Sequence, residues 1–119
     1  MAAKKVLDFL GYKNTVVEVN LVKSSVMRNL NRKFRGKDST TNVLSFGTPS
    51  IFPSHKGFPR LLGEVYLDPT YVSEHNEDIE YLLVHGLLHL LGFDHTRFDD
   101  RIRMNRLEDK IIKWQRIKS

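Results

Sequence analysis

Hydrophobic and polar positions follow one another along the chain in a pattern that predicts short helices and strands. Strands are expected where apolar and β-branched side chains run over strand length, at residues 15–21, 42–46 and 63–67. Helical spacing predicts helices at residues 2–10, 24–34 and 98–117. With a further helix after residue 76, these elements predict an α+β fold: a small mixed sheet of about three to four strands packed with about four helices.

The helix expected at residues 24–34 is amphipathic. Ser24 or Ser25 can cap its N-terminus, and Gly36 can take the left-handed conformation that ends it. Arginine and lysine side chains are expected on its outward side. The apolar side predicted to face inward consists of Val26, Met27, Leu30 and Phe34.

The helix after residue 76 is apolar nearly all round. From Tyr81 to Leu91 the ionisable groups besides the Tyr81 phenol are His85 and His89. We expect Asn76 to cap this helix, and an apolar helix of this kind is normally buried. A buried polar group without a partner costs about 1–3 kcal/mol. Each histidine is therefore either a satisfied core residue or a ligand.

A third histidine completes the spacing H-x-x-x-H-x-x-G-x-x-H. His85 and His89 project from the same side of the helix because they are one turn apart. Gly92 can end the helix and turn the chain so that His95 reaches the same point. Three neutral imidazoles leave the fourth tetrahedral position of a zinc ion open for water, which is typical of a catalytic site. The spacing predicts one Zn²⁺ per chain, although imidazole also suits nickel and copper.

Gly86 restricts the chemistry of this motif. In the zinc-protease pattern H-E-x-x-H, the residue after the first histidine is the glutamate that acts as general base. Glycine cannot take a proton, so peptide hydrolysis by that route is disfavoured. A glycine inside a helix also costs about 1 kcal/mol relative to alanine, and we expect it to let the helix lie close against a sheet.

Size, composition and charge indicate the number of domains, the cellular location and the kind of partner. With 119 residues, 40% of them hydrophobic, the chain is expected to form one globular domain over residues 1–119. It has no apolar run of transmembrane length and no signal-peptide core, and the absence of cysteine fits the cytoplasm. A basic run without an intervening acid suggests a polyanionic partner, with a solvated helix face as the alternative. This run is Lys23, Arg28, Arg32, Lys33, Arg35 and Lys37.

The histidine motif, HGLLHLLGFDH at residues 85–95, resembles the H-G-x-L-H-L-x-G-Y-D-H signature of the YbeY family. That family consists of bacterial endoribonucleases of rRNA maturation with a zinc-protease-like fold. The resemblance runs from about Leu21 to Glu108. Phe93 stands where the family usually has tyrosine, and Glu64 stands where aspartate is common. The other segments that match in the family's order are residues 30–35, 41–46 and 62–65.

The resemblance implies a zinc-dependent endoribonuclease that prefers single strands and acts on ribosomal RNA precursors or a ribosomal subunit. It implies that His85, His89 and His95 are the zinc ligands and that Arg35 is the catalytic arginine. Zinc would polarise a phosphoryl oxygen, and Arg35 would pair with the scissile phosphate and stabilise the transition state.

Other candidates around this site have a second interpretation each. Asp94 can orient a ligand imidazole or simply form a turn. Ser45 and Asn42 can line the cleft or hydrogen-bond at a strand edge. The candidate RNA contacts are Lys23, Arg28, Arg32 and Lys33.

Two other functions stay open at this point. A zinc-stabilised RNA-binding factor for ribosome assembly would keep the metal and lack catalysis, as the missing glutamate suggests. A zinc peptidase would need a base from outside the motif, such as Glu64 or Glu108. The sequence leaves undecided whether water or the ribose 2′-hydroxyl is the nucleophile, and what the oligomeric state is.

Overall fold

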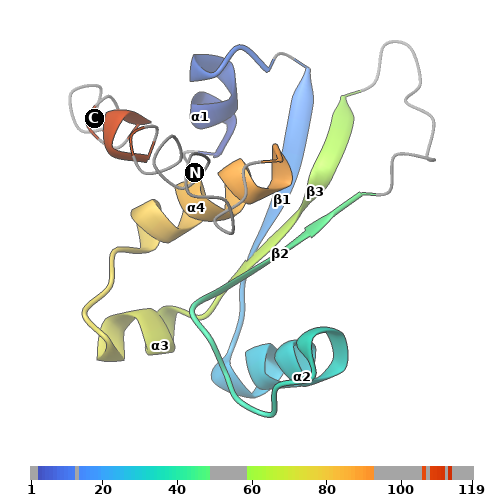
Figure 1. The fold of residues 1–119 in the computed structure, drawn as a ribbon, viewed down its shortest axis with the longest axis vertical. Coiled ribbons are helices and arrows are strands. Elements are labelled where there is room, and N and C mark those ends of the chain that lie inside the picture. The colour runs from blue at the N-terminus through green and yellow to red at the C-terminus, as the bar shows by residue number, and fades with distance from the viewer. Residues whose placement is uncertain are drawn as a thin grey trace.

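The computed structural model describes residues 3–12, 14–48, 59–92, 106, 108–111 and 113. The elements in chain order (Figure 1) are α1 (Ala3–Phe9), β1 (Thr15–Leu21), α2 (Ser24–Arg35), β2 (Val43–Gly47), β3 (Arg60–Leu67), α3 (Pro69–Glu74) and α4 (Ile79–Leu90). The described residues from 106 to 113 are also helical. The predicted α+β class is confirmed, while most of the last predicted helix lies outside the described residues. Among the described residues, no helix has the length and hydrophobicity needed to cross a membrane.

The three strands form one mixed sheet in the order β1-β3-β2. β1 runs parallel to β3 with Val19 opposite Val65, and β2 runs antiparallel to β3 with Ser45 opposite Val65. α4 packs against β2 and β3 on one face of this sheet (Figure 1). Val65, Leu67 and Leu87 are fully buried in the core between them. The histidine-bearing helix α4 therefore packs directly against the central strand β3.

Gly86 allows α4 to lie close to the sheet, as predicted. A Cβ atom at this position would lie 3.1 Å from Val65 Cγ1 and 3.5 Å from Val43 Cγ2. A close-packed interior leaves no space for that extra atom unless its neighbours move. The close approach brings His85 and His89, on either side of Gly86 in the sequence, next to β2.

The cap of α2 differs from the prediction. Lys23 is the N-cap residue and makes no side-chain cap hydrogen bond, so neither Ser24 nor Ser25 has this role. At the other end Gly36 takes a left-handed conformation with φ of 70°, as predicted. Its backbone N–H closes the last turn of the helix.

The apolar side of α2 is only partly buried. Met27 is fully buried, but Val26 is 43% exposed and Phe34 is 54% exposed. The prediction that both of these are core residues was wrong, although the Phe34 ring does pack on an aromatic ring of β2. Asn31 is buried instead and donates from Nδ2 to the backbone oxygen of Ser39 at 2.8 Å. The helix is thus held by the segment that follows it, which leaves part of its apolar side in solvent.

The short helix α3 was not predicted. Asp68 caps it by accepting a hydrogen bond from the Tyr71 backbone N–H at 3.1 Å, and Pro69 occupies its first turn. Thr40 also donates to Asp68 at 2.7 Å. Burial raises the pKa of Asp68, but hydrogen bonds from Ser24, Thr40 and the α3 backbone more than offset it and hold the pKa below its ordinary value. Asp68 therefore ties the start of α2 to α3.

The N-terminus of α4 also differs from the prediction. Asp78, rather than Asn76, is the N-cap residue, and its side chain accepts from the backbone N–H groups of Glu80 and Tyr81. Asn76 takes a left-handed conformation with φ of 54° in the turn between α3 and α4. The turn, which periodicity alone does not reveal, moves the helix start by two residues.

Candidate active site

His85 and His89 of α4 point their rings toward the same place. Their Nε2 atoms are 3.2 Å apart, and the ring planes are tilted by 64° with centroids 4.7 Å apart. The side chain of His85 is 27% exposed, and His89 is exposed. The pair therefore lies where the otherwise buried helix reaches the surface, in a position to meet a ligand.

The separation of the two Nε2 atoms fits a shared metal ion. Two nitrogen ligands of a tetrahedral zinc ion, each at about 2.0–2.1 Å, are about 3.3–3.4 Å from one another. The observed 3.2 Å is close to this value. The expected third ligand, His95, and its neighbour Asp94 lie outside the described residues. Within the described ranges, no group of three His, Cys, Asp or Glu side chains is placed to hold a metal.

A buried carboxyl group contacts the other ring nitrogen of His85. Glu108 Oε2 lies 3.5 Å from His85 Nδ1, and Glu108 is fully buried. Burial and a hydrogen bond to Glu108 raise the pKa of Tyr81 to about 12. The Tyr81 phenol therefore keeps its proton at neutral pH and donates it to the carboxyl group. His85 therefore contacts Glu108, which is itself hydrogen-bonded by Tyr81, inside an otherwise apolar core.

The position of Glu108 was not foreseen from the sequence, where it was considered only as a peptidase base. The available signal was its spacing from Ile111, which is fully buried. Residues three apart share one side of a helix, so the sequence places a carboxyl group on an apolar helix side. Such a group needs a polar partner, and His85 and Tyr81 provide it.

A cleft of about 470 Å³ opens beside the histidines. Its walls come from α2, the segment after α2, β2 and α4. The polar residues lining it include Asn31, Arg35, Lys37, Ser45, His85 and His89. The fold thus brings Arg35 and Ser45, both proposed from the sequence, to the same cleft as the two histidines.

Arg35 is the last residue of α2 and reaches the edge of β2. Its Nη2 donates to the backbone oxygen of Ser45 at 3.4 Å, and its guanidinium carbon is 5.7 Å from the centre of the Phe46 ring. The residue is exposed. Because a guanidinium group has five N–H donors, an anion in the cleft can be bound by a pair of them.

Asn42 is not among the residues that line the cleft. Its Oδ1 accepts from the Val43 backbone N–H at 2.7 Å, and its Nδ2 donates to the Glu77 carboxylate at 3.2 Å. These bonds connect the start of β2 to the turn before α4.

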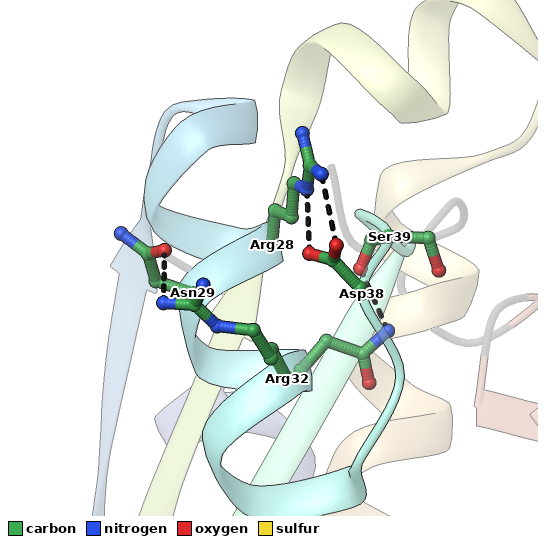
Figure 2. Close-up of polar contacts among 6 residues, drawn as sticks. Arg28, Asn29, Arg32, Asp38 and Ser39 are labelled. Atoms are coloured by element: carbon green, nitrogen blue, oxygen red, sulfur yellow. Dashed lines mark hydrogen bonds and ion pairs between the residues drawn. The ribbon is translucent and has the colours of Figure 1, made fainter.

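The predicted RNA contacts lie on the exposed side of α2 and at its start. Figure 2 shows that Arg28 is paired with Asp38, with Nε–Oδ1 and Nη2–Oδ2 distances of 2.9 and 3.1 Å. This hydrogen bond to Arg28 holds the pKa of Asp38 below its ordinary value. Arg32 donates to Asn29 Oδ1 at 3.3 Å (Figure 2). All four candidate RNA contacts are exposed: Lys23, Arg28, Arg32 and Lys33.

The two glutamates considered as peptidase bases lie away from the cleft. Glu64 accepts a hydrogen bond from the Tyr66 hydroxyl at 3.0 Å, on the sheet face opposite α4. Glu108 lies behind His85. No carboxylate of the described residues lines the cleft, which leaves the peptidase interpretation without a base in the described part of the chain.

Comparison with known proteins gives one consistent result. The family model described as Endoribonuclease YbeY matches residues 2–115. A relative from Persephonella marina named Endoribonuclease YbeY is 35% identical, covering 94% of this chain and 78% of the relative. One from a Sulfurihydrogenibium species with the same name is 37% identical, covering 92% and 76%. A solution structure from Thermotoga maritima is similar, with a TM-score of 0.50, 26% identity and coverage of 99% of this chain and 89% of that one.

Proposed function

Because the chain belongs to the YbeY endoribonuclease family, we propose that it is a zinc-dependent endoribonuclease that cleaves single-stranded RNA. Residues 1–119 would act as one catalytic domain in the cytoplasm. The substrate would be a ribosomal RNA precursor, free or in a ribosomal subunit. The names of the relatives support RNA cleavage. The histidine pair supports the metal, the size of the cleft supports the preference for single strands, and the ribosomal substrate is what the resemblance to the family implies.

One observation carries the proposal. Two imidazoles whose Nε2 atoms meet at 3.2 Å share a cleft with an exposed arginine, Arg35. A cation held by the histidines would share the cleft with the guanidinium group, so that both could bind one phosphate. Lys37 adds a further positive charge to the cleft. This charge distribution favours a phosphodiester over a neutral peptide bond.

In this proposal the histidines bind the metal and Arg35 binds the phosphate. His85, His89 and His95 would hold the ion, and Asp94 would support one of these rings. When bound, zinc would polarise a phosphoryl oxygen and lower the pKa of its bound water to about 7. Arg35 pairs with the scissile phosphate and stabilises the negative charge that develops on its oxygens during cleavage.

The exposed cations of α2 bind the strand outside the cleft. Lys23, Arg32 and Lys33 would contact phosphates and supply affinity that depends on salt. Arg28 would contribute less than these, because its guanidinium group is already paired with Asp38. Ser45 would line the path of the strand through the cleft.

We expect the protein to cut a fluorescent single-stranded RNA and to leave a duplex of the same sequence and casein intact. A stiff A-form duplex cannot follow a cleft of this size, whereas a flexible strand can. The measurement is gel analysis of cleavage with zinc present and with a chelator. His89→Ala purified in the same way is the control, because equal cutting by both preparations would reveal a contaminating ribonuclease.

The same assay also distinguishes the endoribonuclease from the alternative, a zinc-stabilised RNA-binding factor without catalysis. Zinc content by elemental analysis and RNA affinity are measured on the same wild-type preparation. If that preparation holds zinc and binds RNA but does not cut it at high concentration, the nuclease proposal fails.

A further inference from the structure

A row of aromatic rings crosses the sheet face opposite α4. Phe34 of α2 and Phe46 of β2 have centroids 5.1 Å apart, and Phe46 and Tyr66 of β3 have centroids 5.8 Å apart. Val65 and Leu67 are buried on the α4 side. Because side chains alternate along a strand, Tyr66 between them points to the other face, away from α4.

The end of this row nearest the cleft is exposed and positively charged. Phe34 is 54% exposed, and Lys33 Nζ lies 5.4 Å from the centre of its ring. The guanidinium carbon of Arg35 lies 5.7 Å from the centre of the Phe46 ring. We call Phe34 and Phe46 the aromatic ledge. Arg35 contacts this ledge and also lines the cleft, so the two surfaces are continuous.

The far end of the row has the opposite charge. Tyr66 donates from its hydroxyl to Glu64 at 3.0 Å, and Glu18 lies opposite Glu64 in the neighbouring strand β1. Two carboxylates on this part of the face repel a phosphate backbone. A polyanion on the ledge is therefore favoured on the side of Lys33 and Arg35 only.

We propose that the aromatic ledge stacks a nucleobase of the RNA strand, next to the phosphate that Arg35 binds. Every base has a π-face, so stacking on Phe34 adds affinity without selecting a sequence. Lys33 and Arg35 beside the rings complement the phosphates on either side of the stacked base. This inference rests on the proposed function, since it names the part of the substrate that lies beside the scissile phosphate.

The test compares Phe34→Leu with Phe34→Tyr. The probe is a fluorescent 2′-O-methyl single-stranded oligoribonucleotide, checked on a gel to remain intact, and its Kd for the zinc-loaded protein is measured by anisotropy. Phe34→Leu keeps an apolar side chain without a π-face and should weaken binding by at least about fivefold. Phe34→Tyr keeps the ring and should bind nearly as the wild type does.

Two controls separate stacking from other effects. Val26→Ala removes an exposed apolar side chain from the same helix, two turns away, and should leave the Kd unchanged. A set of oligonucleotides with one abasic position each should include one that wild type binds as weakly as Phe34→Leu binds the intact strand. With that oligonucleotide, Phe34→Leu should cause no further loss.

The outcomes distinguish the ledge from the nuclease proposal. If Phe34→Leu leaves the Kd unchanged while wild type still cuts RNA, the stacking proposal fails and the endoribonuclease proposal stands. An equal loss with every abasic oligonucleotide overturns stacking, because the effect would then not involve a base. If wild type binds the probe but does not cut RNA, the endoribonuclease proposal fails. The same Kd comparison then still decides whether the aromatic ledge stacks a base.

A second, independent observation concerns Glu108. A fully buried carboxyl group lies 3.5 Å from Nδ1 of His85, the ring nitrogen that does not face His89, and it also accepts a hydrogen bond from Tyr81. We infer that Glu108 is a positioning residue: its carboxylate accepts a hydrogen bond from the Nδ1–H of His85 and thereby keeps Nε2 directed at the metal. Carboxylates in this position orient histidine ligands and raise their basicity.

The test uses Glu108→Leu combined with Tyr81→Phe, so that the Tyr81 hydroxyl does not stay behind in the core without its acceptor. Replacing both partners by apolar side chains should leave the thermal unfolding of the metal-free protein nearly unchanged. Zinc affinity, measured by competition with a chromogenic chelator, should fall by about 10- to 100-fold. A merely structural residue would give the reverse: lower unfolding temperature and unchanged zinc affinity.

The single variant Glu108→Gln provides the conservative rescue. Its amide oxygen can still accept from Nδ1, so zinc affinity should lie between those of the wild type and the double variant. If the double variant does not fold, Glu108→Gln decides alone, because the neutral amide binds the ring less strongly than a carboxylate does. Zinc affinity equal to that of wild type would overturn the positioning role.

Discussion

Replacement of His89 with alanine is expected to remove the bound zinc and to lower RNA cleavage by roughly 10³-fold or more, since a catalytic metal supplies several kcal/mol of transition-state stabilisation. The reason lies in the 3.2 Å contact between His89 Nε2 and His85 Nε2. Without one of the paired nitrogens, the remaining ligands cannot complete the site. Elemental analysis of the purified variant and a chelator-sensitive cleavage assay measure the two effects.

The fold should survive this change, because His89 is exposed and lies on the outer side of α4. The metal-free variant and the metal-free wild type should therefore unfold at similar temperatures. His75→Ala is the matched control. His75 is exposed at the end of α3, where its ring stacks on Tyr71 at 3.8 Å. Full zinc occupancy in His89→Ala would refute the metal assignment, and loss of zinc in His75→Ala would show that the assay does not report on the site.

Replacement of Arg35 with alanine is expected to lower kcat by about 10²- to 10³-fold, the effect of removing one preorganised donor to developing negative charge. The affinity for RNA should change much less, because other cations contact the strand. The distinction follows from position: Arg35 lines the cleft with His85 and His89, while the remaining cations of α2 do not. Single-turnover cleavage at saturating enzyme, together with a separate Kd, gives both quantities.

Lys23→Ala and Arg32→Ala are the controls for Arg35→Ala. Both residues are exposed and neither lines the cleft. Each change should weaken binding and reduce the slope of log affinity against log salt by about one, with little effect on kcat. Arg35→Lys should recover only part of the activity, since an ammonium group cannot bind a phosphate bidentately. Equal effects of all three alanine variants on kcat and affinity would mean that Arg35 is one more phosphate contact.

Local pattern alone determined much of the histidine-bearing helix α4. The 3.6-residue period directs His85 and His89 to one side, and the apolar residues around them indicate that the helix is buried. Gly86 was expected to let the helix lie close against a sheet, and the 3.1 Å contact that a Cβ atom would make with Val65 confirms this. These properties depend on residues within one or two turns, so they can be read from the sequence.

Local pattern failed where several short elements compete. The prediction that Asn76 caps α4 and that Ser24 or Ser25 caps α2 was wrong, because neighbouring Asp78 and Lys23 take those places. Asparagine and aspartate are nearly equivalent as caps, so the turn before α4 decides between them, whereas α2 begins without any side-chain cap.

Only the tertiary structure decided which distant residues share the site. Glu108 is 23 positions from His85 in the sequence, yet its carboxyl lies 3.5 Å from the ring. Arg35 reaches the histidines' cleft because its guanidinium group contacts β2, against which α4 packs. Phe34 was expected in the core, but its ring packs only on Phe46 of the sheet edge and stays 54% exposed. Periodicity determines which side of an element is apolar, whereas what covers that side depends on contacts between elements far apart in the chain.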